Sequence, residues 1–317
     1  MENPYAKIYP ACIIAAERYN MTDKKKETKE PLITGTSPLG SAGLFAERER
    51  RLKDLEQLTL LSDVFMSVVL SDRNACQHVI RILMDDPGIE LVSVRTQYVI
   101  SKVISHGARL DVLAEDKKGV ICHLEIEGAD VADHARRTRF YGSVTDGEFL
   151  RKGRDYNELP ERYIFYISRK DIWKDGYTVY EEEKRFRQTG KKHNDGSHLI
   201  YVNAEIDDGS RIAKLMKYFK TADPFDDSEG ELSKRVRFLK TEEGGIEIMC
   251  EIMEKIREEG KQEGELIGIR EGRKSGMLES HKKTAWNLEK MGMPLDSIAK
   301  VVEEDIYVVR QWLKPAK

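Results

Sequence analysis

The stretch GARLDVLAEDKKGVICHLEIEGAD, residues 107–130, decides the fold of this chain. Residues 109–115 and 120–127 have the side-chain alternation of strands, and DKKG (116–119) between them is typical of a turn. One face of the predicted hairpin is wholly apolar and comprises Leu110, Val112, Ala114, Val120, Cys122, Leu124 and Ile126. That face must be buried, so the sequence predicts an antiparallel hairpin packed on a core.

The opposite face of the hairpin carries three carboxylates. Folding the chain about Lys118 places Asp111 opposite Glu125, where Cβ atoms are about 5 Å apart, and Glu127 follows on the same face. Carboxylates this close raise one another's pKa unless a cation neutralises them. A hard divalent cation does so with one or two carboxylates, water and phosphate oxygens as ligands. The acidic face therefore indicates a metal site for phosphodiester chemistry.

An ordinary solvent-facing sheet surface is the alternative for these acids, because antiparallel hairpins often keep one wet face. Asp111 argues against it. Aspartate is a poor strand former, and Asp111 lies between apolar neighbours, with Leu110 before it and Val112 after it. Both interpretations stay open on the residues alone.

The composition limits the classes of function. The chain has 53 basic and 56 acidic residues among 317, so any nucleic-acid site must be a local basic patch. Hydrophobic residues make up 40%, which is enough for a core. No apolar run approaches the roughly 18 residues that a membrane span needs. Four cysteines far apart fit neither a disulfide framework nor a zinc site. We expect a soluble, cytoplasmic protein without a membrane segment.

Apolar spacing predicts further elements around the hairpin. Residues 45–84 are helix-like with a break at 72–74, and three strands are expected between Ile89 and Ile126. The remaining predictions are helix 131–150, strands 163–168, 177–183 and 198–206, helix 211–219, and helices throughout after Ser233. The chain is thus expected to comprise a variable tail (1–45), a core (46–225), a helical region (226–285) and a C-terminal hairpin (286–317).

Two features mark the C-terminal helices. Glycines recur every fourth residue at Gly260, Gly264, Gly268, Gly272 and Gly276. Each glycine costs a helix about 1 kcal/mol, so the row indicates either close packing with another helix or an exposed linker helix. The segment 294–313 is similar to a helix-turn-helix that would present Tyr307, Arg310 and Gln311 outward. A small hairpin for protein contact is the alternative.

Several ordered blocks together resemble the PD-(D/E)xK nuclease superfamily, and within it the family of recombination-promoting nucleases or putative transposases. The likeness covers residues 52–206 and the glycine-repeat tail. The blocks are RLDVLAEDKKG…LEIE, LSDVF (61–65), RTRFYGS (137–143), LRKGRDYNELPERYIFYI (150–167) and DGSHLIYVNAEI (195–206). The resemblance implies an α/β fold, a restriction-endonuclease-like mixed sheet flanked by helices, here with a helical C-terminal extension.

The resemblance also implies roles for the acids. Asp111 and Glu125 would ligate Mg²⁺ or Mn²⁺, and Asp63 would be a supporting catalytic acid from the first helix. Glu127 occupies the third catalytic position, where the superfamily has lysine and this branch usually glutamine. Met66 likewise stands where the family usually has lysine. These two departures leave reduced activity, an altered metal preference or loss of catalysis open.

A basic cluster follows the acids. Arg136 and Arg139 share one face of the predicted helix, and Arg137 shares another with Tyr141. Arg137, Arg139 and Tyr141 are the predicted substrate-binding residues, because arginines beside a metal site can hold phosphates. The alternative is that they only balance the nearby acids. Tyr163, Phe165 and Tyr166 in the apolar strand are expected to be core residues.

The leading hypothesis is a metal-dependent DNA endonuclease, a hydrolase in which Asp111 and Glu125 hold the metal and Arg137 stabilises developing charge. DNA is the expected substrate, and a homodimer through the C-terminal helices would let two subunits cut two strands. A catalytically degenerate nuclease fold that binds DNA or protein is the second hypothesis. An oligomer built only by the glycine-row helix is the third.

Overall fold

The computed structural model describes residues 41–100, 108–127, 133–150 and 152–314, with side chains from residue 49 onward. Most of the predicted tail therefore lies outside the described residues. The first described helix is α2 (Ser41–Gln57). The chain divides into two compact units, residues 1–255 and 256–317, which are treated separately below.

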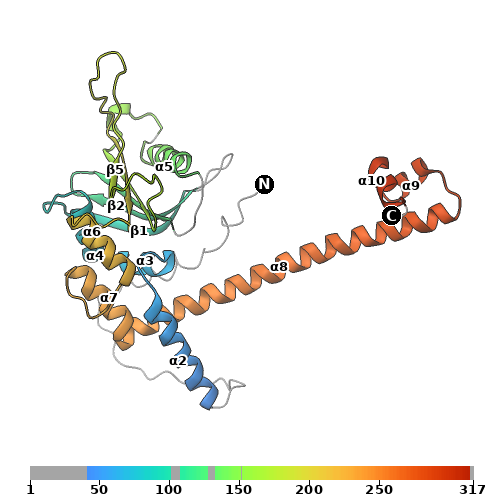
Figure 1. Cartoon of the computed structure of the whole chain (residues 1–317), viewed down its shortest axis with the longest axis horizontal. Coiled ribbons are helices and arrows are strands. Elements are labelled where there is room, and N and C mark those ends of the chain that lie inside the picture. Colours follow the sequence, from blue (N-terminus) through green and yellow to red (C-terminus); the bar gives the residue numbers. More distant parts are fainter. Residues whose placement is uncertain (1–40, 101–107, 128–132, 151, 315–317) are drawn as a thin grey trace. The chain divides into compact units, whose positions relative to one another are not determined.

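A mixed six-stranded sheet forms the centre of the first unit (Figure 1). Its strands are β1 (Leu91–Ile100), β2 (Ala108–Asp116), β3 (Ile121–Glu127), β4 (Arg162–Ser168), β5 (Val179–Glu181) and β6 (Ser197–Asn203). They lie in the order β1-β2-β3-β4-β6-β5. The β3-β4-β6 core of the sheet is parallel, and the other pairs are antiparallel. The predicted α/β fold with a mixed sheet and flanking helices is confirmed.

The β2–β3 hairpin has the register that the turn sequence predicts. Val112 pairs with Leu124 and Ala114 with Cys122. The Asp116 side chain accepts hydrogen bonds from two backbone amides of the turn, at 2.8 Å each. Gly119 has φ +80°, in the left-handed region that favours glycine. Continued by one residue, this register brings Asp111 opposite Glu125.

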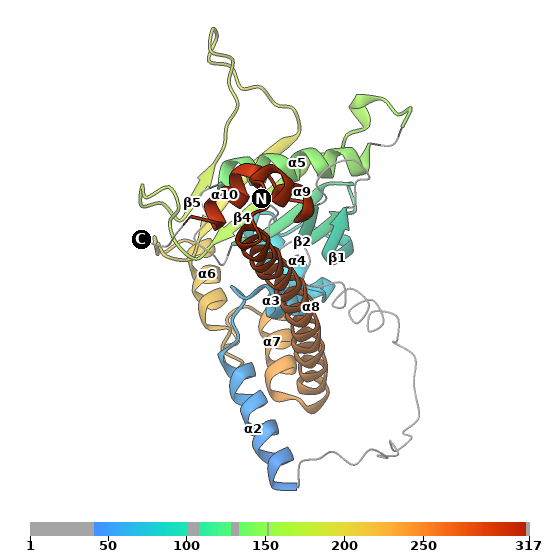
Figure 2. The same ribbon diagram turned by 90° about the vertical axis from the view of Figure 1, so that its right-hand side faces the viewer.

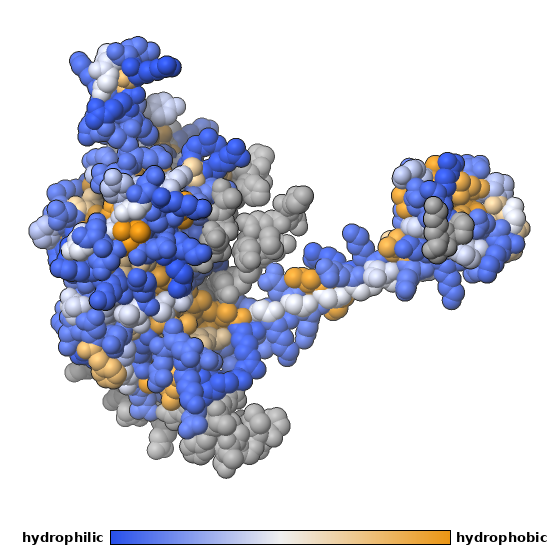
Figure 3. Space-filling model, viewed as in Figure 1, coloured by the Kyte–Doolittle hydropathy of each residue, from blue (hydrophilic) through white to orange (hydrophobic). Residues whose placement is uncertain are grey.

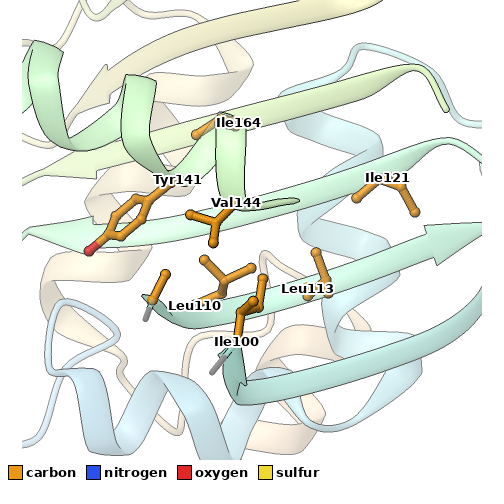
Figure 4. Packing of buried hydrophobic residues seen from close by; sticks show 8 residues of the cluster. Ile100, Leu110, Leu113, Ile121, Tyr141, Val144 and Ile164 are labelled. Carbon is orange, nitrogen blue, oxygen red and sulfur yellow. The ribbon is translucent and has the colours of Figure 1, made fainter. Parts of the chain in front are cut away.

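Helix α5 (His134–Phe149) covers one face of the sheet, as the crossover between the parallel strands β3 and β4 requires. Figure 4 shows Tyr141 and Val144 of α5 over Leu110 and Ile164 of the strands. This helix buries the acidic face of the hairpin: Asp111, Glu125 and Glu127 are only 5%, 2% and 7% exposed. The alternative of a wet outer face is therefore wrong.

The opposite face packs against α3 (Asp63–Leu70) and α4 (Arg73–Leu83), and a second layer is formed by α6 (Arg211–Thr221) and α7 (Glu231–Thr241) (Figure 2). A buried carboxylate joins these helices. Glu229, just before α7, lies 2.9 Å from His78 Nε2 of α4 and accepts a 2.8 Å hydrogen bond from Arg211 of α6.

Three predicted elements differ in the structure. The helical region 45–84 breaks not only before α4, where Asp72 caps the helix, but also at 58–62. There the Leu60 amide donates to the Phe219 carbonyl of α6 at 3.1 Å, so a tertiary contact replaces the helical bond. The strand expected over 177–183 is the shorter β5. The helix expected over 131–150 is α5, which begins at His134 and ends at Phe149. A short 3-10 helix (Tyr156–Glu158) was not predicted.

The long helix α8 (Glu243–Lys290) enters the second unit, which ends with α9 (Leu295–Val301) and α10 (Ile306–Trp312). The predicted pair of short helices is confirmed. Its apolar cluster comprises Ala285, Ile298, Ala299, Val302 and Val309. Tyr307, Arg310 and Gln311 are exposed, as expected. Within the described residues, no helix has the length and apolarity to cross a membrane.

Candidate functional site

Asp111 and Glu125 meet at the end of the hairpin. The Asp111 carboxylate accepts a 2.9 Å hydrogen bond from the Ile126 amide across the strands. Glu125 Oε2 lies 3.5 Å from the Asp111 amide nitrogen and 3.1 Å from His123 Nε2. The sequence predicted this juxtaposition from the turn alone, and the structure brings the two side chains together.

Burial shifts the ionisation of this pair. The pKa of Asp111 lies well above its usual value, because the carboxyl is desolvated and because Glu125 and Asp63 are close. Burial raises the pKa of Glu125 to about 7, although Arg137 and Tyr141 oppose the shift. Burial and mutual repulsion disfavour the ionised forms of these two carboxyl groups. Binding of a cation between them is therefore electrostatically favourable.

Arg137 from α5 spans the acids. Its guanidinium forms an ion pair with Glu127, lies 3.6 Å from Glu125, and donates a 2.8 Å hydrogen bond to the Tyr141 hydroxyl. The predicted pairing of Arg137 with Tyr141 on one helix face is confirmed. Since the Arg137 side chain is 34% exposed, its guanidinium is in reach of a ligand as well as of the acids.

Tyr166 is a site residue that the sequence does not reveal. It is fully buried in β4, as expected of a core residue, but its hydroxyl donates a 3.0 Å hydrogen bond to Glu127. His134 Nδ1 lies 2.9 Å from the same hydroxyl. A buried tyrosine hydroxyl usually has a polar partner, which is the one sequence signal that points to such a role.

Asp63 begins α3 at the margin of this cluster. The side chain is exposed overall, but partial desolvation and Glu127 raise the pKa of its carboxyl, while Arg109 and Arg137 oppose the rise. Arg109 also opposes the rise in the pKa of Asp111. The structure thus brings Asp63 near the acids as expected, together with Arg109, which the strand alternation puts on the same face as Asp111.

Two further residues, Arg139 and His123, lie near the cluster of Asp111, Glu125 and Arg137. Arg139 is exposed on α5, and within the described ranges no acid forms an ion pair with it. His123 is buried beside Glu125, and burial lowers its pKa to about 4, so the ring is neutral near pH 7. Its Nδ1 atom has no hydrogen-bond partner in the part of the chain that the structure describes.

Comparison with known proteins decides the family. A family described as PD-(D/E)XK nuclease family transposase matches residues 82–262, more than half of the chain. The chain belongs to this family. No curated protein and no solved structure matches it. The matched region begins in α4 and ends in α8, so it includes all six strands of the sheet.

PD-(D/E)XK proteins generally use divalent metals, and the donor set here fits one by its chemistry. Asp111 and Glu125 offer oxygen atoms of the kind Mg²⁺ prefers, and one or two carboxylates suffice when water and phosphate complete the shell. Among the described residues, no group of three or more histidine, cysteine or acidic side chains is arranged to hold an ion. Two carboxylates are therefore the donor set that the site provides.

The departures from the PD-(D/E)XK pattern have structural counterparts. The carboxylate of Glu127, the residue that the resemblance places at the usual lysine position, pairs with Arg137, which brings a positive charge to it from α5. Met66 is completely buried in α3 and contributes to the core. A lysine at position 66 would have to place its charge in that core.

Proposed function

We propose that this PD-(D/E)XK family protein is a metal-dependent DNA endonuclease that hydrolyses phosphodiester bonds. The buried Asp111–Glu125 pair beside Arg137 is the observation that carries the proposal. A metal ion there would neutralise two carboxylates whose ionisation burial opposes, and the arginine would face the phosphate.

Each side chain has a proposed task. Asp111 and Glu125 hold the ion, and Asp63 is a supporting acid at the margin. When bound, Mg²⁺ or Mn²⁺ polarises a phosphoryl oxygen and lowers the pKa of a water molecule. Arg137 binds the phosphate and stabilises the negative charge that develops on its oxygens. Glu127 and Tyr141 orient the guanidinium through their hydrogen bonds with it. Arg139 serves as an outer phosphate contact on α5.

Plasmid cleavage with Mg²⁺ or Mn²⁺ tests this function. We expect wild type to nick or cut DNA, and we expect Asp111→Asn and Glu125→Gln to lose at least about a hundredfold in rate. Both replacements keep the side-chain volume, so melting temperatures serve as the folding control. Cleavage that persists in both variants refutes the assignment.

A catalytically degenerate DNA-binding or protein-interaction module is the second candidate. Two observations favour it: Glu127 already pairs with Arg137, and among the described residues no group of three or more histidine, cysteine or acidic side chains is arranged to hold an ion. This alternative predicts salt-sensitive DNA retention without metal-stimulated cleavage. Turnover combined with metal binding excludes it.

We also propose a homodimer through α8. Among the residues described, the glycine row has no neighbouring atom within 4 Å of where a Cβ would lie, and Leu266, Ile267 and Ile269 are exposed on the same stretch of helix. Figure 3 shows exposed apolar side chains along α8. Acids dominate the helix before position 270 (Glu258, Glu259, Glu263, Glu265), and bases dominate after it (Arg270, Arg273, Lys274, Lys282, Lys283). An antiparallel second copy would match these halves.

Sedimentation of the full chain tests the dimer. We expect wild type to sediment as a dimer and Ile269→Glu as a monomer, because a buried unpaired charge opposes association. A monomeric wild type overturns the dimer and leaves the proposed active site untouched. A cytoplasmic, reducing location stays a proposal, supported by the free thiols of Cys76, Cys122 and Cys250.

A further inference from the structure

A narrow hairpin leaves the sheet between β5 and β6; we call residues 182–196 the hairpin arm. Figures 1 and 2 show it extending beyond the strands near β5. Arg185 and Lys192 form an antiparallel bridge, and the His193 amide donates to the Lys184 carbonyl at 2.8 Å. At the tip, the Gly190 amide donates to the Phe186 carbonyl at 2.8 Å. The arm is therefore an ordered backbone element.

Basic side chains outnumber acidic ones in the arm. Its sequence EEKRFRQTGKKHNDG contains five cationic side chains: Lys184, Arg185, Arg187, Lys191 and Lys192. Those near the base are neutralised, since Glu183 pairs with Arg185 and Lys192, and Asp195 pairs with Lys184. Among the described residues, the cations at the tip of the arm have no such acidic partner.

Arg187 and Lys191 at the tip have no ion pair among the described residues, and both are exposed. Phe186 beside them is 50% exposed, and its ring lies against His193 at 5.1 Å between centroids. Two unneutralised cations and a half-exposed aromatic ring add nothing to the packing of the sheet. The combination suits a nucleic acid, whose phosphates would pair with the two cations and whose sugars or bases would pack against the aromatic ring.

Helix α5 connects the acids to the base of the arm. Near its start, His134 lies 2.9 Å from the Tyr166 hydroxyl beside Glu127. Near its end, Asp146 accepts a 2.8 Å hydrogen bond from Arg162, which in turn donates to Ser197 at the start of β6. One helix thus runs along the strands from the acidic site to the place where the arm begins.

Two further cations lie along this helix. Arg136 and Arg139 are both exposed, and no acid within the described ranges forms an ion pair with either. Together with Arg137, they form a basic cluster in the first two turns of α5, beside the acids, whereas the end of the helix near the arm carries Asp146 and Glu148. In a chain whose charges nearly cancel, this is the local basic patch that contact with DNA requires.

The length of chain from the acids to the tip is close to one turn of the DNA helix. Glu125 is level with Tyr201 in the sheet, four residues from the start of β6 at Ser197. Four residues of strand and about seven of the arm give a path of up to roughly 35 Å at about 3.3 Å per residue. One turn of B-DNA is about 34 Å long. A duplex along α5, with one phosphate at Arg137, would reach the tip one turn away.

We propose that the tip of the hairpin arm binds the phosphate backbone of duplex DNA about one helical turn from the Asp111–Glu125 pair. Arg187 and Lys191 contact phosphates, and Phe186 lies against the sugars or the groove edge. The proposal rests on DNA being the substrate and deepens it, because it assigns a binding element outside the acidic site.

Fluorescence anisotropy with a duplex of about three helical turns, in EDTA so that no cleavage occurs, tests the arm. We expect the double variant Arg187→Ala/Lys191→Ala to bind at least roughly tenfold more weakly near 0.1 M salt. The slope of log K against log salt should fall by about 1.8, which is about 0.9 for each lost phosphate contact. Phe186→Ala should weaken binding with little change in slope.

Matched controls carry the same changes elsewhere on the unit. Lys214→Ala/Lys217→Ala removes two exposed charges from α6, and Phe225→Ala removes a ring that is 79% exposed. We expect both controls to bind as wild type does. Arm variants that match their controls in affinity and salt slope overturn the proposal, and so does a single strand of equal length that competes as well as the duplex.

Cleavage separates this proposal from the active site. We expect the double arm variant to keep its kcat in Mg²⁺ while its KM rises, whereas Glu125→Gln should lose kcat and still bind DNA. Wild-type cleavage with unaffected arm variants overturns the arm alone. If wild type neither binds nor cuts DNA, both proposals fail.

Discussion

Glu127 departs from the superfamily pattern, which has a positively charged lysine, and Arg137 brings a positive charge to the Glu127 carboxylate. The glutamate stands at the lysine position, and its partners Tyr166 and Arg137 come from β4 and α5. The departure at Glu127 is visible in the sequence, but this compensation is not. Tyr166 lies 39 residues from Glu127 along the chain, and no local pattern links them. By contrast, a single turn was enough to predict the pairing of Asp111 with Glu125.

Arg137→Lys keeps the charge and removes the planar fork. Lysine cannot bridge Glu127 and Tyr141 while also facing a phosphate, so we expect the cleavage rate to fall by roughly a hundredfold. Single-turnover cleavage at saturating DNA measures the effect, and Arg139→Lys is the control on the same helix. Equal rates for Arg137→Lys and wild type would remove Arg137 from the proposed chemistry.

The ionisation of Glu125 predicts a pH effect on stability. Burial raises its pKa from 4.5 to about 7, so between these values the folded chain holds a proton that the unfolded chain releases. The contribution of Glu125 to stability should therefore decline as the pH rises from about 4.5 to about 7, by up to roughly 3 kcal/mol at about 1.36 kcal/mol per pKa unit. Asp111 shifts in the same direction and adds to the decline.

Urea unfolding in EDTA across this pH range measures the decline. Glu125→Gln cannot titrate at this position, so its stability should decline much less over the same range. The exposed replacement Glu265→Gln is the control and should follow wild type. His123 titrates in the opposite sense in both proteins, because burial lowers its pKa to about 4, so the comparison with Glu125→Gln isolates the glutamate. A wild-type stability that changes with pH in the same way as that of Glu125→Gln would contradict the shift.

Among the secondary-structure elements, polarity patterns identified nearly every strand, because burial on one or both faces leaves a period in the sequence. They failed where a tertiary contact decides. Residues 58–62 continue a helical pattern, yet the Leu60 amide bonds to α6 instead. The hairpin arm was also missed, since its polar residues carry no period and its shape depends on a few backbone hydrogen bonds.

Glu229 ties α4, α6 and α7 together from a buried position, 1% exposed. Glu229→Ala leaves His78 and Arg211 without their partner, and we expect the free energy of unfolding to fall by about 3 kcal/mol or more. The nearby Glu231→Ala breaks only an exposed pair with Lys234 and should cost under about 1 kcal/mol. Chemical denaturation of both variants compares them, and equal losses would show that the buried network adds nothing.

For the whole molecule, composition limits any nucleic-acid surface to a local patch but does not locate that patch. The four-part division at residues 45, 225 and 285 remains a proposal beside the two compact units. Each unit has its own apolar cluster, one around the sheet and one joining α8, α9 and α10. Separate clusters imply that the units unfold separately.

Differential scanning calorimetry tests the independence of the two units. Ile298→Ala opens a cavity in the second unit, and we expect it to destabilise that transition by about 2–4 kcal/mol while the other stays in place. Leu110→Ala should do the reverse, because Leu110 belongs to the cluster under α5. A single transition that both variants shift equally would contradict two independent units.

Crystals soaked in Mn²⁺ and measured for anomalous scattering would locate the ion. We expect one strong peak within about 2.0–2.6 Å of carboxylate oxygens of both Asp111 and Glu125, beside the Arg137 guanidinium. Glu125→Gln should lose the peak. A map with no peak at these two residues, or with the ion bound elsewhere in the chain, would contradict the metal-dependent nuclease.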